Sequence, residues 1–366
     1  MDVPDRPPQR ILVLYNVPAQ SPVKGDAQDA VSEAEVVQTA AAVAQALKTM
    51  GYPSVELFGL TADLAAFLTA LDRYQPDMVF NLCEGIDGDE HHEPLVTHLL
   101  EFRNIPFTGG GTRAVTDSND KHRAKQILIA DGIPTPDSYV VRSLAELKAL
   151  ELYFPVIVKP VQENASLGIT QESVVHDPSK LLEPVAYVLE KYRQPALIER
   201  YIEGREFNIA VLGNSDPWVL PIAEVDYSHL PAGIPKILFY EAKWIEDSPL
   251  YLKTPIICPA RNVSAKLAER LQDVSRRAYR ALGCTGYARV DLRVSRAGKP
   301  YVIEVNCNPS LSAEAGFARS ARHAGLEYPS LVDRIVQYAR EKFTGARRST
   351  NLEVASGEGI LQSCAE

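Results

Sequence analysis

Two short apolar segments in the last third of the chain constrain its fold more than any other feature. Residues 289–294 read Arg-Val-Asp-Leu-Arg-Val, residues 301–306 read Tyr-Val-Ile-Glu-Val-Asn, and a polar, glycine-containing link of residues 295–299 lies between them. Apolar and polar residues alternate along both segments, which is the period of a half-buried β-strand. A short link of this kind is typical of a hairpin. The sequence therefore predicts an antiparallel β-hairpin over residues 289–306.

The polar positions of this hairpin carry the side chains that a magnesium site needs. Glu304 and Asn306 lie two residues apart, as do Arg289 and Asp291, so the members of each pair share one face of a strand. Magnesium takes oxygen ligands and leaves its other positions to water and nucleotide phosphates. Asp291, Glu304 and Asn306 beside a basic residue therefore predict a metal site that serves a nucleotide. The open alternative is a hairpin whose polar face is only solvated.

The composition excludes several classes of protein. A length of 366 residues allows two or three domains, and 46% hydrophobic with 23% charged residues is typical of a globular chain. The net charge of −9 argues against a nucleic-acid partner, which would require a basic face. The chain has no run of eighteen apolar residues, and its proline-rich, charged start is unlike a signal peptide. We therefore predict a cytoplasmic protein that binds small molecules and does not contact a membrane.

Cysteine and histidine give no sign of a structural metal. The five cysteines are widely spaced and include no C-x-x-C pair, so neither a disulfide framework nor a zinc site is indicated. His91, His92 and Glu93 are adjacent, and adjacent side chains on one element point apart. We predict a solvated loop at these three residues.

Strands alternate with helices along the first part of the chain. The predicted strands are residues 10–17, 54–58 and 78–82, and the predicted helices are residues 30–50, 62–73 and 94–102. This alternation predicts a parallel sheet covered by helices, so residues 1–112 are expected to form an α/β domain. A glycine triplet at residues 109–111 marks the expected boundary.

The rest of the chain predicts two α+β domains, over residues 113–202 and 203–345. Their expected helices are residues 119–130, 143–150, 178–192, 264–282 and 329–341, and their expected strands besides the hairpin are residues 138–141, 154–159, 196–201, 206–212, 219–224 and 255–258. Residues 346–366 are polar, small and aperiodic, which predicts a disordered tail.

Two strand ends carry charged residues that are candidates for ligand binding. Lys159 ends the apolar segment Pro-Val-Ile-Val, and burying an ammonium is costly unless it meets an anion. Glu199 stands near the end of another apolar strand, where a carboxylate can accept from an adenine amino group. The backbone N–H of Ile202 can donate to the ring, and Glu206 can accept from ribose hydroxyls. A merely exposed carboxylate at Glu199 is the alternative.

These motifs, in this order along residues 10–340, resemble the ATP-grasp ligases and among them the D-alanine–D-alanine ligases. The motifs are Asp120-Lys121, Val158-Lys159-Pro160 with the loop 163–169, Glu199 to Ile202 with Gly204-Arg205-Glu206, Tyr240 to Lys243, and the hairpin with Asn308-Pro309. The resemblance implies an ATP-grasp fold, in which an N-terminal parallel α/β domain precedes two α+β domains that clamp ATP.

The resemblance also implies roles for individual residues. The ATP-binding residues would be Lys121, Lys159, Ser166, Glu199, Tyr201, Ile202, Glu206, Lys243 and Ile303. Asp291, Glu304 and Asn306 would hold two Mg²⁺ ions, for which Mn²⁺ can substitute. Lys243 would contact the γ-phosphate and Arg289 the oxyanion of the transition state, and the loop 162–168 would cover the phosphates. A homodimer is expected by analogy.

The departures from the family pattern concern the substrates. In the family, a glutamate near the first βα turn, a lid serine and a tyrosine after the lysine of the E-A-K motif hold the first amino acid. Here Ala165 and Trp244 stand at the last two positions, and neither carries a hydroxyl. Glu33 matches the glutamate only faintly and can equally be an exposed helix residue. Trp244 and Ala165 together predict a bulkier or less polar first substrate, whereas a core tryptophan is the alternative.

At the second substrate site, Ser310 stands where the family has a glycine, and Ala315 stands where it has a serine. Both positions follow Asn308. Lost hydroxyls would leave an amino-acid substrate's charged groups unpaired, at about 1–3 kcal/mol each. We predict an ATP-dependent carboxylate–amine ligase that forms an acyl phosphate and joins an amino acid to a small carboxylate or a cyclic acceptor, with amide or imine formation both open. A true D-alanine–D-alanine ligase, a non-catalytic ATP-binding protein and a carboxylase that uses bicarbonate are the alternatives.

Overall fold

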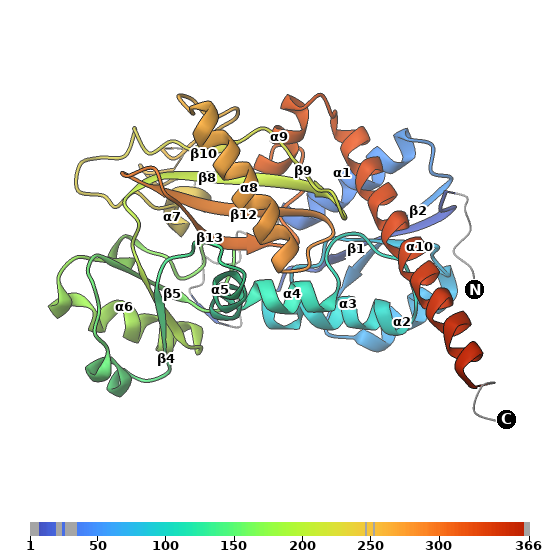
Figure 1. The fold of residues 1–366 in the computed structure, drawn as a ribbon, viewed down its shortest axis with the longest axis horizontal. Helices are drawn as coiled ribbons and strands as arrows, with labels where there is room; N and C mark the ends of the chain where they lie inside the picture. Colours follow the sequence, from blue (N-terminus) through green and yellow to red (C-terminus); the bar gives the residue numbers. More distant parts are fainter. Residues whose placement is uncertain (1–6, 20–23, 26–34, 246, 252, 362–366) are drawn as a thin grey trace.

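A parallel three-stranded sheet forms the first part of the molecule. The computed structural model describes residues 7–19, 24–25, 35–245, 247–251 and 253–361. The sheet has the order β2-β1-β3, and its strands are β1 (Arg10–Asn16), β2 (Ser54–Leu60) and β3 (Met78–Asn81). Helices α1 (Glu35–Thr49), α2 (Leu64–Tyr74) and α3 (Glu93–Phe102) accompany it. The predicted α/β opening is therefore present (Figure 1).

An antiparallel four-stranded sheet forms the middle part, at the lower left of Figure 1. Its order is β4-β7-β5-β6, with β4 (Ser138–Val141), β5 (Val156–Pro160), β6 (Val174–Val175) and β7 (Ala196–Arg200). Helices α4 (Thr112–Asn119), α5 (Lys121–Ala130) and α6 (Leu182–Tyr187) belong to this stretch of chain. The residues predicted as a helix over 143–150 form a 3₁₀ helix, Leu144–Ala149, and those of the C-terminal part of 178–192 form a π-helical turn, Val188–Tyr192.

A larger antiparallel sheet carries the predicted hairpin. Its order is β11-β10-β8-β12-β13, and β9 also pairs with β8. The strands are β8 (Gly204–Gly213), β9 (Trp218–Val219), β10 (Ala223–Val225), β11 (Ile256–Ile257), β12 (Gly286–Ser295) and β13 (Pro300–Asn306). The helices that follow or interrupt them are α7 (Tyr240–Trp244), α8 (Ala265–Ala281), α9 (Gly316–His323) and α10 (Tyr328–Leu361). The predicted strand 219–224 is two short strands, and α9 was not predicted.

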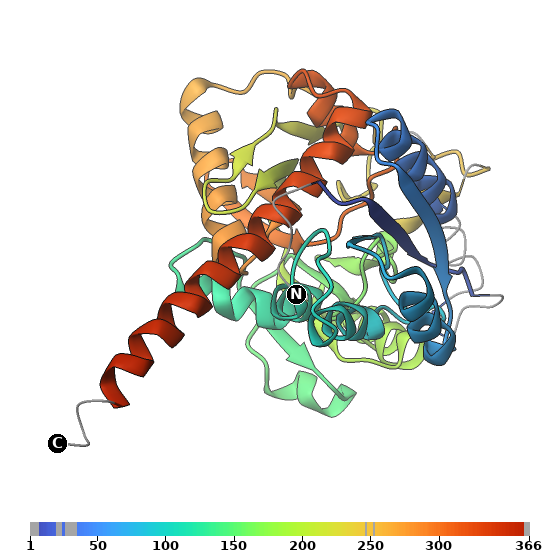
Figure 2. The same ribbon diagram turned by 90° about the vertical axis from the view of Figure 1, so that its right-hand side faces the viewer.

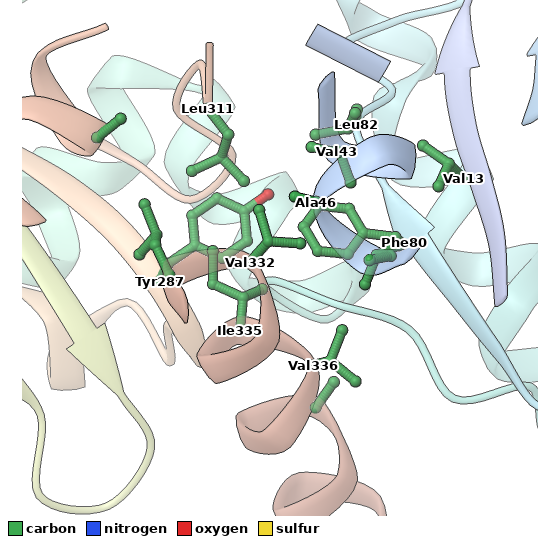
Figure 3. Packing of buried hydrophobic residues seen from close by; sticks show 14 of the residues in the cluster. Val13, Val43, Ala46, Phe80, Leu82, Tyr287, Leu311, Val332, Ile335 and Val336 are labelled. Carbon is green, nitrogen blue, oxygen red and sulfur yellow. The ribbon is translucent and has the colours of Figure 1, made fainter. Parts of the chain in front are cut away.

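The first and last parts of the chain share one hydrophobic core. Tyr287 of β12 and Val332, Ile335 and Val336 of α10 pack in the same cluster as Val13 of β1 and residues of α1 and β3. Figure 3 shows Tyr287 beside Val332 and Leu311, with Val43 and Phe80 on the other side of the cluster. Helix α10 therefore joins the predicted C-terminal domain to the N-terminal sheet, and burial of both sets of side chains stabilises this arrangement.

The C-terminal segment differs from its prediction. Helix α10 extends to Leu361 and includes residues 346–361, which were predicted as part of a disordered tail. The end of α10 projects from the body of the molecule (Figure 2). A helix whose first turns are packed extends cheaply, because each further residue adds one hydrogen bond. Over the ranges described, no helix combines the length and the apolar character that crossing a membrane requires.

Candidate active site

A cavity of about 680 Å³ lies where the three sheets meet. Residues of β5, β8, β12 and β13 line it together with residues at and after the ends of β1 and β3. Every predicted site residue that the structure describes lines this cavity, namely Lys121, Lys159, Ala165, Ser166, Glu199, Tyr201, Ile202, Glu206, Lys243, Trp244, Arg289, Asp291, Ile303, Glu304, Asn306, Asn308, Ser310 and Ala315. Glu33 lies outside the described residues.

The register of the β12–β13 hairpin brings its polar side chains together. Asp291 pairs with Glu304 and Arg289 pairs with Asn306 across the two strands, and residues directly opposite each other share a face of the sheet. A β-bulge leaves Ile303 without a pairing partner. Because a bulge re-aims side chains, the consecutive residues Ile303 and Glu304 can both line the cavity.

Arg289 and Asp291 form a bidentate ion pair within β12. Nε of Arg289 lies 2.8 Å from Oδ1 of Asp291, and Nη2 lies 2.8 Å from Oδ2. Nδ2 of Asn208, on the neighbouring strand β8, also donates to Oδ1 at 2.8 Å. Asp291 is only 5% exposed. The alternative of a solvated hairpin is therefore wrong, because this carboxylate is buried and hydrogen-bonded within the protein.

Glu304 is paired with the first predicted ATP lysine. Nζ of Lys121 lies 2.8 Å from Oε1 of Glu304 and also donates to the backbone carbonyl of Glu163. Burial alone would raise the pKa of Glu304, but the positive charges of Lys121 and Lys159 outweigh it and lower the pKa to about 2. The carboxylate is therefore ionised at any working pH, which is the form that binds a metal ion.

The donor set of the hairpin fits a magnesium ion that shares its coordination with phosphates. Asp291 and Glu304 supply carboxylates and Asn306 supplies an amide oxygen, and all three line the cavity. In the part of the chain that the structure describes, no three His, Cys, Asp or Glu side chains are grouped to hold a metal on their own. Two carboxylates and an amide are typical of a site completed by water and substrate oxygens rather than of an all-protein cage.

Glu199 lies between two buried lysines. Its Oε2 is 2.5 Å from Nζ of Lys125, and its Oε1 is 3.3 Å from Nζ of Lys159. Burial by itself would raise the pKa of Glu199, but the charges of Lys125 and Lys159 outweigh it and hold the pKa below its usual value. Glu199 is 2% exposed, so the alternative of an exposed carboxylate at the strand end is wrong.

Glu206 is held by a network that begins at Arg293. Nη1 of Arg293 donates to Oε2 of Glu206 at 2.8 Å, and the hydroxyl of Tyr227 donates to the same oxygen at 2.8 Å. Nε of Arg293 donates to the backbone carbonyl of Ile202 at 2.6 Å. The guanidinium also lies 4.8 Å from the centre of the Tyr201 ring. This network fixes the three predicted adenosine-binding positions relative to one another.

The predicted lid, residues 162–168, is fastened on both sides of the cavity. The indole Nε1 of Trp244 donates to the carbonyl of Ala165 at 2.9 Å, and Oε2 of Glu90 accepts from the backbone N–H of Asn164 at 2.8 Å. Gly168 has a φ of +73°, and a Cβ there would approach Cγ of Pro160 to 2.5 Å. The loop therefore requires glycine at its end. Trp244 is a half-buried cavity residue, so its alternative as a core residue is wrong.

Lys243 and Glu84 are ionisable residues that form no ion pair with any other described residue. Burial and the nearby charge of Arg289 lower the pKa of Lys243 to about 8. Burial and the charges of Glu93 and Glu35 raise the pKa of Glu84 to about 8. Both groups line the cavity, and each is stabilised in its neutral form because burial and the like charges near it outweigh the opposite charges.

Glu93 and Asn308 connect helix α3 to the segment that follows the hairpin. Nδ2 of Asn308 donates to Oε1 of Glu93 at 3.1 Å and to the carbonyl of Cys83 at 2.8 Å, while its Oδ1 accepts from the Tyr287 hydroxyl at 2.8 Å. Glu93 is 3% exposed, and burial raises its pKa to about 7 although hydrogen bonds from Asn119 and Asn308 oppose this. The predicted solvated loop is therefore wrong. Glu93 begins α3 and is covered by a distant segment, and His91 and His92 are exposed but form a 3₁₀ helix, Glu90–His92.

The family is established by comparison with known proteins. A family model described as the D-ala D-ala ligase C-terminus matches residues 130–337, more than half of the chain. The chain belongs to the D-alanine–D-alanine ligase family. The predicted ATP-grasp fold and the prediction of a C–N bond-forming ligase are thereby confirmed.

Individual relatives and a solved structure are similar to this ligase over most of their length. An uncharacterised protein of Sinorhizobium fredii, y4sG, is 37% identical over 286 residues, which cover 76% of this chain and 81% of the relative. A D-alanine–D-alanine ligase of Carboxydothermus hydrogenoformans is 33% identical over 323 residues, which cover 85% of this chain and 95% of that protein. The crystal structure of a Bacillus anthracis D-alanine–D-alanine ligase complexed with ATP has a TM-score of 0.68 at 25% identity and covers 92% of this chain and 99% of its own.

Several residues that organise the ligase site were not predicted from the sequence. Lys125 lies one helical turn after Lys121 on α5, a spacing that places both on one face and could have revealed it. Arg293 follows Asp291 by two residues and shares its strand face, so the same period that identified Asp291 could have identified Arg293. Asn208 and Glu84 had no such signal, because Asn208 reaches the site from β8 and Glu84 from the segment that follows β3.

Proposed function

We propose that this ligase phosphorylates a carboxylate with ATP and joins the resulting acyl phosphate to an amine, with release of ADP and phosphate. The observation that carries the proposal is the β12–β13 hairpin, which sets Arg289, Asp291 and Glu304 on one face of a cavity beside the buried Lys121. An acyl phosphate needs no protein nucleophile, so positioning and charge stabilisation are the work left to these side chains.

The charged residues of the cavity have different proposed roles in positioning and charge stabilisation. Lys121, Lys159 and Lys243 present ammonium groups to the cavity, which suits three positions along a triphosphate. Arg289 is oriented by two bonds to Asp291, and its remaining N–H groups can donate to the oxygen on which charge develops when the amine attacks. Asp291, Glu304 and Asn306 would hold Mg²⁺, which supplies charge neutralisation between the phosphates when bound. We also propose that Glu33 binds the first substrate and that the enzyme works as a cytoplasmic homodimer.

The proposed substrates differ from those in the relatives' names. The positions of Ala165, Trp244, Ser310 and Ala315 line the cavity, and three of them lack the hydroxyls that the family pattern places there. We propose that an amino acid is joined to another small carboxylate or to a cyclic acceptor. D-alanyl-D-alanine formation is the second candidate, and the names of the relatives in Carboxydothermus hydrogenoformans and Bacillus anthracis favour it.

A phosphate-release screen tests both candidates. Purified protein with ATP and Mg²⁺ is supplied with D- and L-amino acids, singly and in pairs, and then with other small carboxylates, and products are identified by mass spectrometry. We expect phosphate release with a pair other than D-alanine with itself. Release with D-alanine alone would establish the second candidate, whereas no release above the ATP-only background with any member would contradict the proposed reaction.

A further inference from the structure

Arg319 lines the cavity, and no acidic side chain of the described residues forms an ion pair with it. It lies on α9, four residues after Ala315, and its guanidinium bonds only to backbone among the described residues: Nη1 donates to the carbonyl of Ile256 and Nη2 to the carbonyl of Glu314, both at 2.8 Å. The carboxylate of Glu314 lies 3.9 Å from Arg322 instead. A guanidinium has five N–H donors, so three of those of Arg319 remain uncommitted to the described protein.

The place of this charge on its helix is unfavourable for folding. Glu314 precedes α9, so the bond to its carbonyl brings the guanidinium back to the amino end of the helix. The amino end of a helix repels a positive charge. A charged group placed against a local rule, inside a cavity, is expected at a binding site. The two hydrogen bonds to backbone carbonyls hold the guanidinium in one orientation. A planar guanidinium with free N–H donors can bind a carboxylate through two parallel hydrogen bonds.

The corner around Arg319 has room for such a group. Ala315 and Gly316 present only a methyl group and a hydrogen, and a Cβ on Gly316 would meet nothing closer than Cδ1 of Ile256 at 3.8 Å. Ala315, Gly316 and Phe317 line the same cavity as Lys243 and Arg289. A ligand that reaches both regions can therefore have one end at Arg319 and the other at the proposed reaction centre.

We propose that Arg319 binds a substrate carboxylate that is not activated in the reaction and so determines which substrates this ligase accepts. The inference rests on the proposed function. A carboxylate of this kind can belong to the amine substrate, which is then an amino acid, or to the acid substrate, which is then a dicarboxylic acid. In both cases the product keeps a free carboxylate paired with Arg319.

Binding measurements test this without requiring turnover. The full-length protein, with Mg²⁺ and a non-hydrolysable ATP analogue, is titrated calorimetrically with amino acids and with their carboxamides. A second arm compares succinate with butyrate. We expect at least one carboxylate to bind about tenfold to a hundredfold more tightly than its uncharged counterpart. The arm in which the difference is found identifies the substrate that carries the group.

The variants Arg319→Gln, Arg319→Lys and Arg322→Gln separate recognition from structure. R319Q should lose the carboxylate preference and R319K should keep only part of it, whereas R322Q should match the wild type. Arg322 is the matched control because it also lies on α9 and bonds to a backbone carbonyl, that of Ala313, but does not line the cavity. Affinity for the ATP analogue, unchanged in R319Q, verifies its fold.

Two results would overturn the inference: no preference for a carboxylate in the wild type, or an unchanged preference in R319Q. The proposed function fails separately. Arg319-dependent binding without phosphate release for any substrate would leave the carboxylate site in place and remove the ligase reaction, whereas phosphate release with an unchanged KM in R319Q would do the reverse.

Discussion

The charged residues around the cavity form two groups, which we call the paired end and the unpaired end and which differ in whether their members have ion pairs. The paired end consists of nine charged residues that each have an ion pair, namely Lys121, Lys125, Lys159, Glu199, Glu206, Arg289, Asp291, Arg293 and Glu304. At the unpaired end, Glu84, Lys243 and Arg319 line the cavity without an ion pair among the described residues. The pKa values of Lys243 and Glu84 are both shifted to about 8.

This difference indicates which end holds a constant ligand and which end is free to vary. A buried charge that has a partner stays ionised without a ligand, whereas an unpaired buried charge meets its counter-charge only when the substrate brings it. The charged residues that match the family's ATP motifs belong to the paired end, apart from Lys243. The unpaired end contains Glu84 and Arg319, which no motif predicted. We therefore expect substitutions at the paired end to affect stability and nucleotide binding, and those at the unpaired end to affect substrate choice.

The largest effect is expected for Glu199→Gln at the paired end. Neutralising this carboxylate leaves Lys125 and Lys159 buried without an anion, which should lower the free energy of unfolding by about 3–5 kcal/mol. Urea denaturation measures the change. Glu203→Gln is the control, because Glu203 pairs with Arg296 on the surface and should cost less than about 1 kcal/mol. Equal losses in the two variants would show that the pairing around Glu199 does not matter.

Glu304→Gln should abolish the dependence of ATP binding on magnesium. In the wild type we expect Mg²⁺ to tighten ATP binding relative to EDTA by about a hundredfold, or about 2.7 kcal/mol. E304Q loses one carboxylate of the donor set and should bind ATP equally with and without the metal, as measured by calorimetry. Asp216→Asn, at a fully exposed side chain, should behave as the wild type. A magnesium dependence retained in E304Q would remove this residue from the metal site.

Glu84→Gln, at the unpaired end, should raise the free energy of unfolding at high pH, whereas Glu199→Gln should lower it. The folded-state pKa of Glu84 is about 8, above its unfolded value, so the stability it contributes is present below pH 4.5 and is lost as the pH rises through 8. E84Q removes that loss. At pH 8.5 it should exceed the wild type by on the order of 2 kcal/mol, since solvent in the cavity screens part of the charge, and at pH 5 the two should be nearly equal.

Urea denaturation at the two pH values measures this effect, and Glu93, Glu35, Lys243 and Arg289 are the charges that act on Glu84. A stability difference that is the same at both pH values, or a loss at pH 8.5, would mean that Glu84 is not an unpaired carboxylate. The comparison between the two ends of the cavity would then fail at this point.

The paired end could be predicted from the sequence because its signals are local. Arg289, Asp291, Glu304 and Asn306 all lie in one hairpin, and the two-residue period of a strand fixes which of them share a face. Lys159 and Glu199 were predicted for the same reason, since each follows an apolar strand. What the sequence did not show is that β5 and β7 are adjacent and that Lys125 completes the cluster.

The unpaired end could not be predicted because tertiary contacts create it. Glu93 was interpreted as solvated, yet Asn308, more than two hundred residues later in the chain, covers it. Helix α9 is eight residues long and reads Gly-Phe-Ala-Arg-Ser-Ala-Arg-His. A segment of this length is too short for its apolar period to predict a helix. Without α9, nothing in the sequence places Arg319 beside Ile256.

Trp244→Phe tests the contact between the lid and the residue next to Lys243, and we expect the smallest effect there. The substitution removes the bond from Nε1 to the Ala165 carbonyl, worth about 1 kcal/mol, so ATP should bind about fivefold more weakly if the lid must be closed. Trp218→Phe is the matched control, because Trp218 lies on β9 and does not line the cavity. In W218F, Trp244 is the one remaining tryptophan of the chain, so its fluorescence should change when ATP binds. Equal ATP affinities in W244F and W218F, with no fluorescence change, would show that the Trp244–Ala165 bond does not hold the lid over the nucleotide.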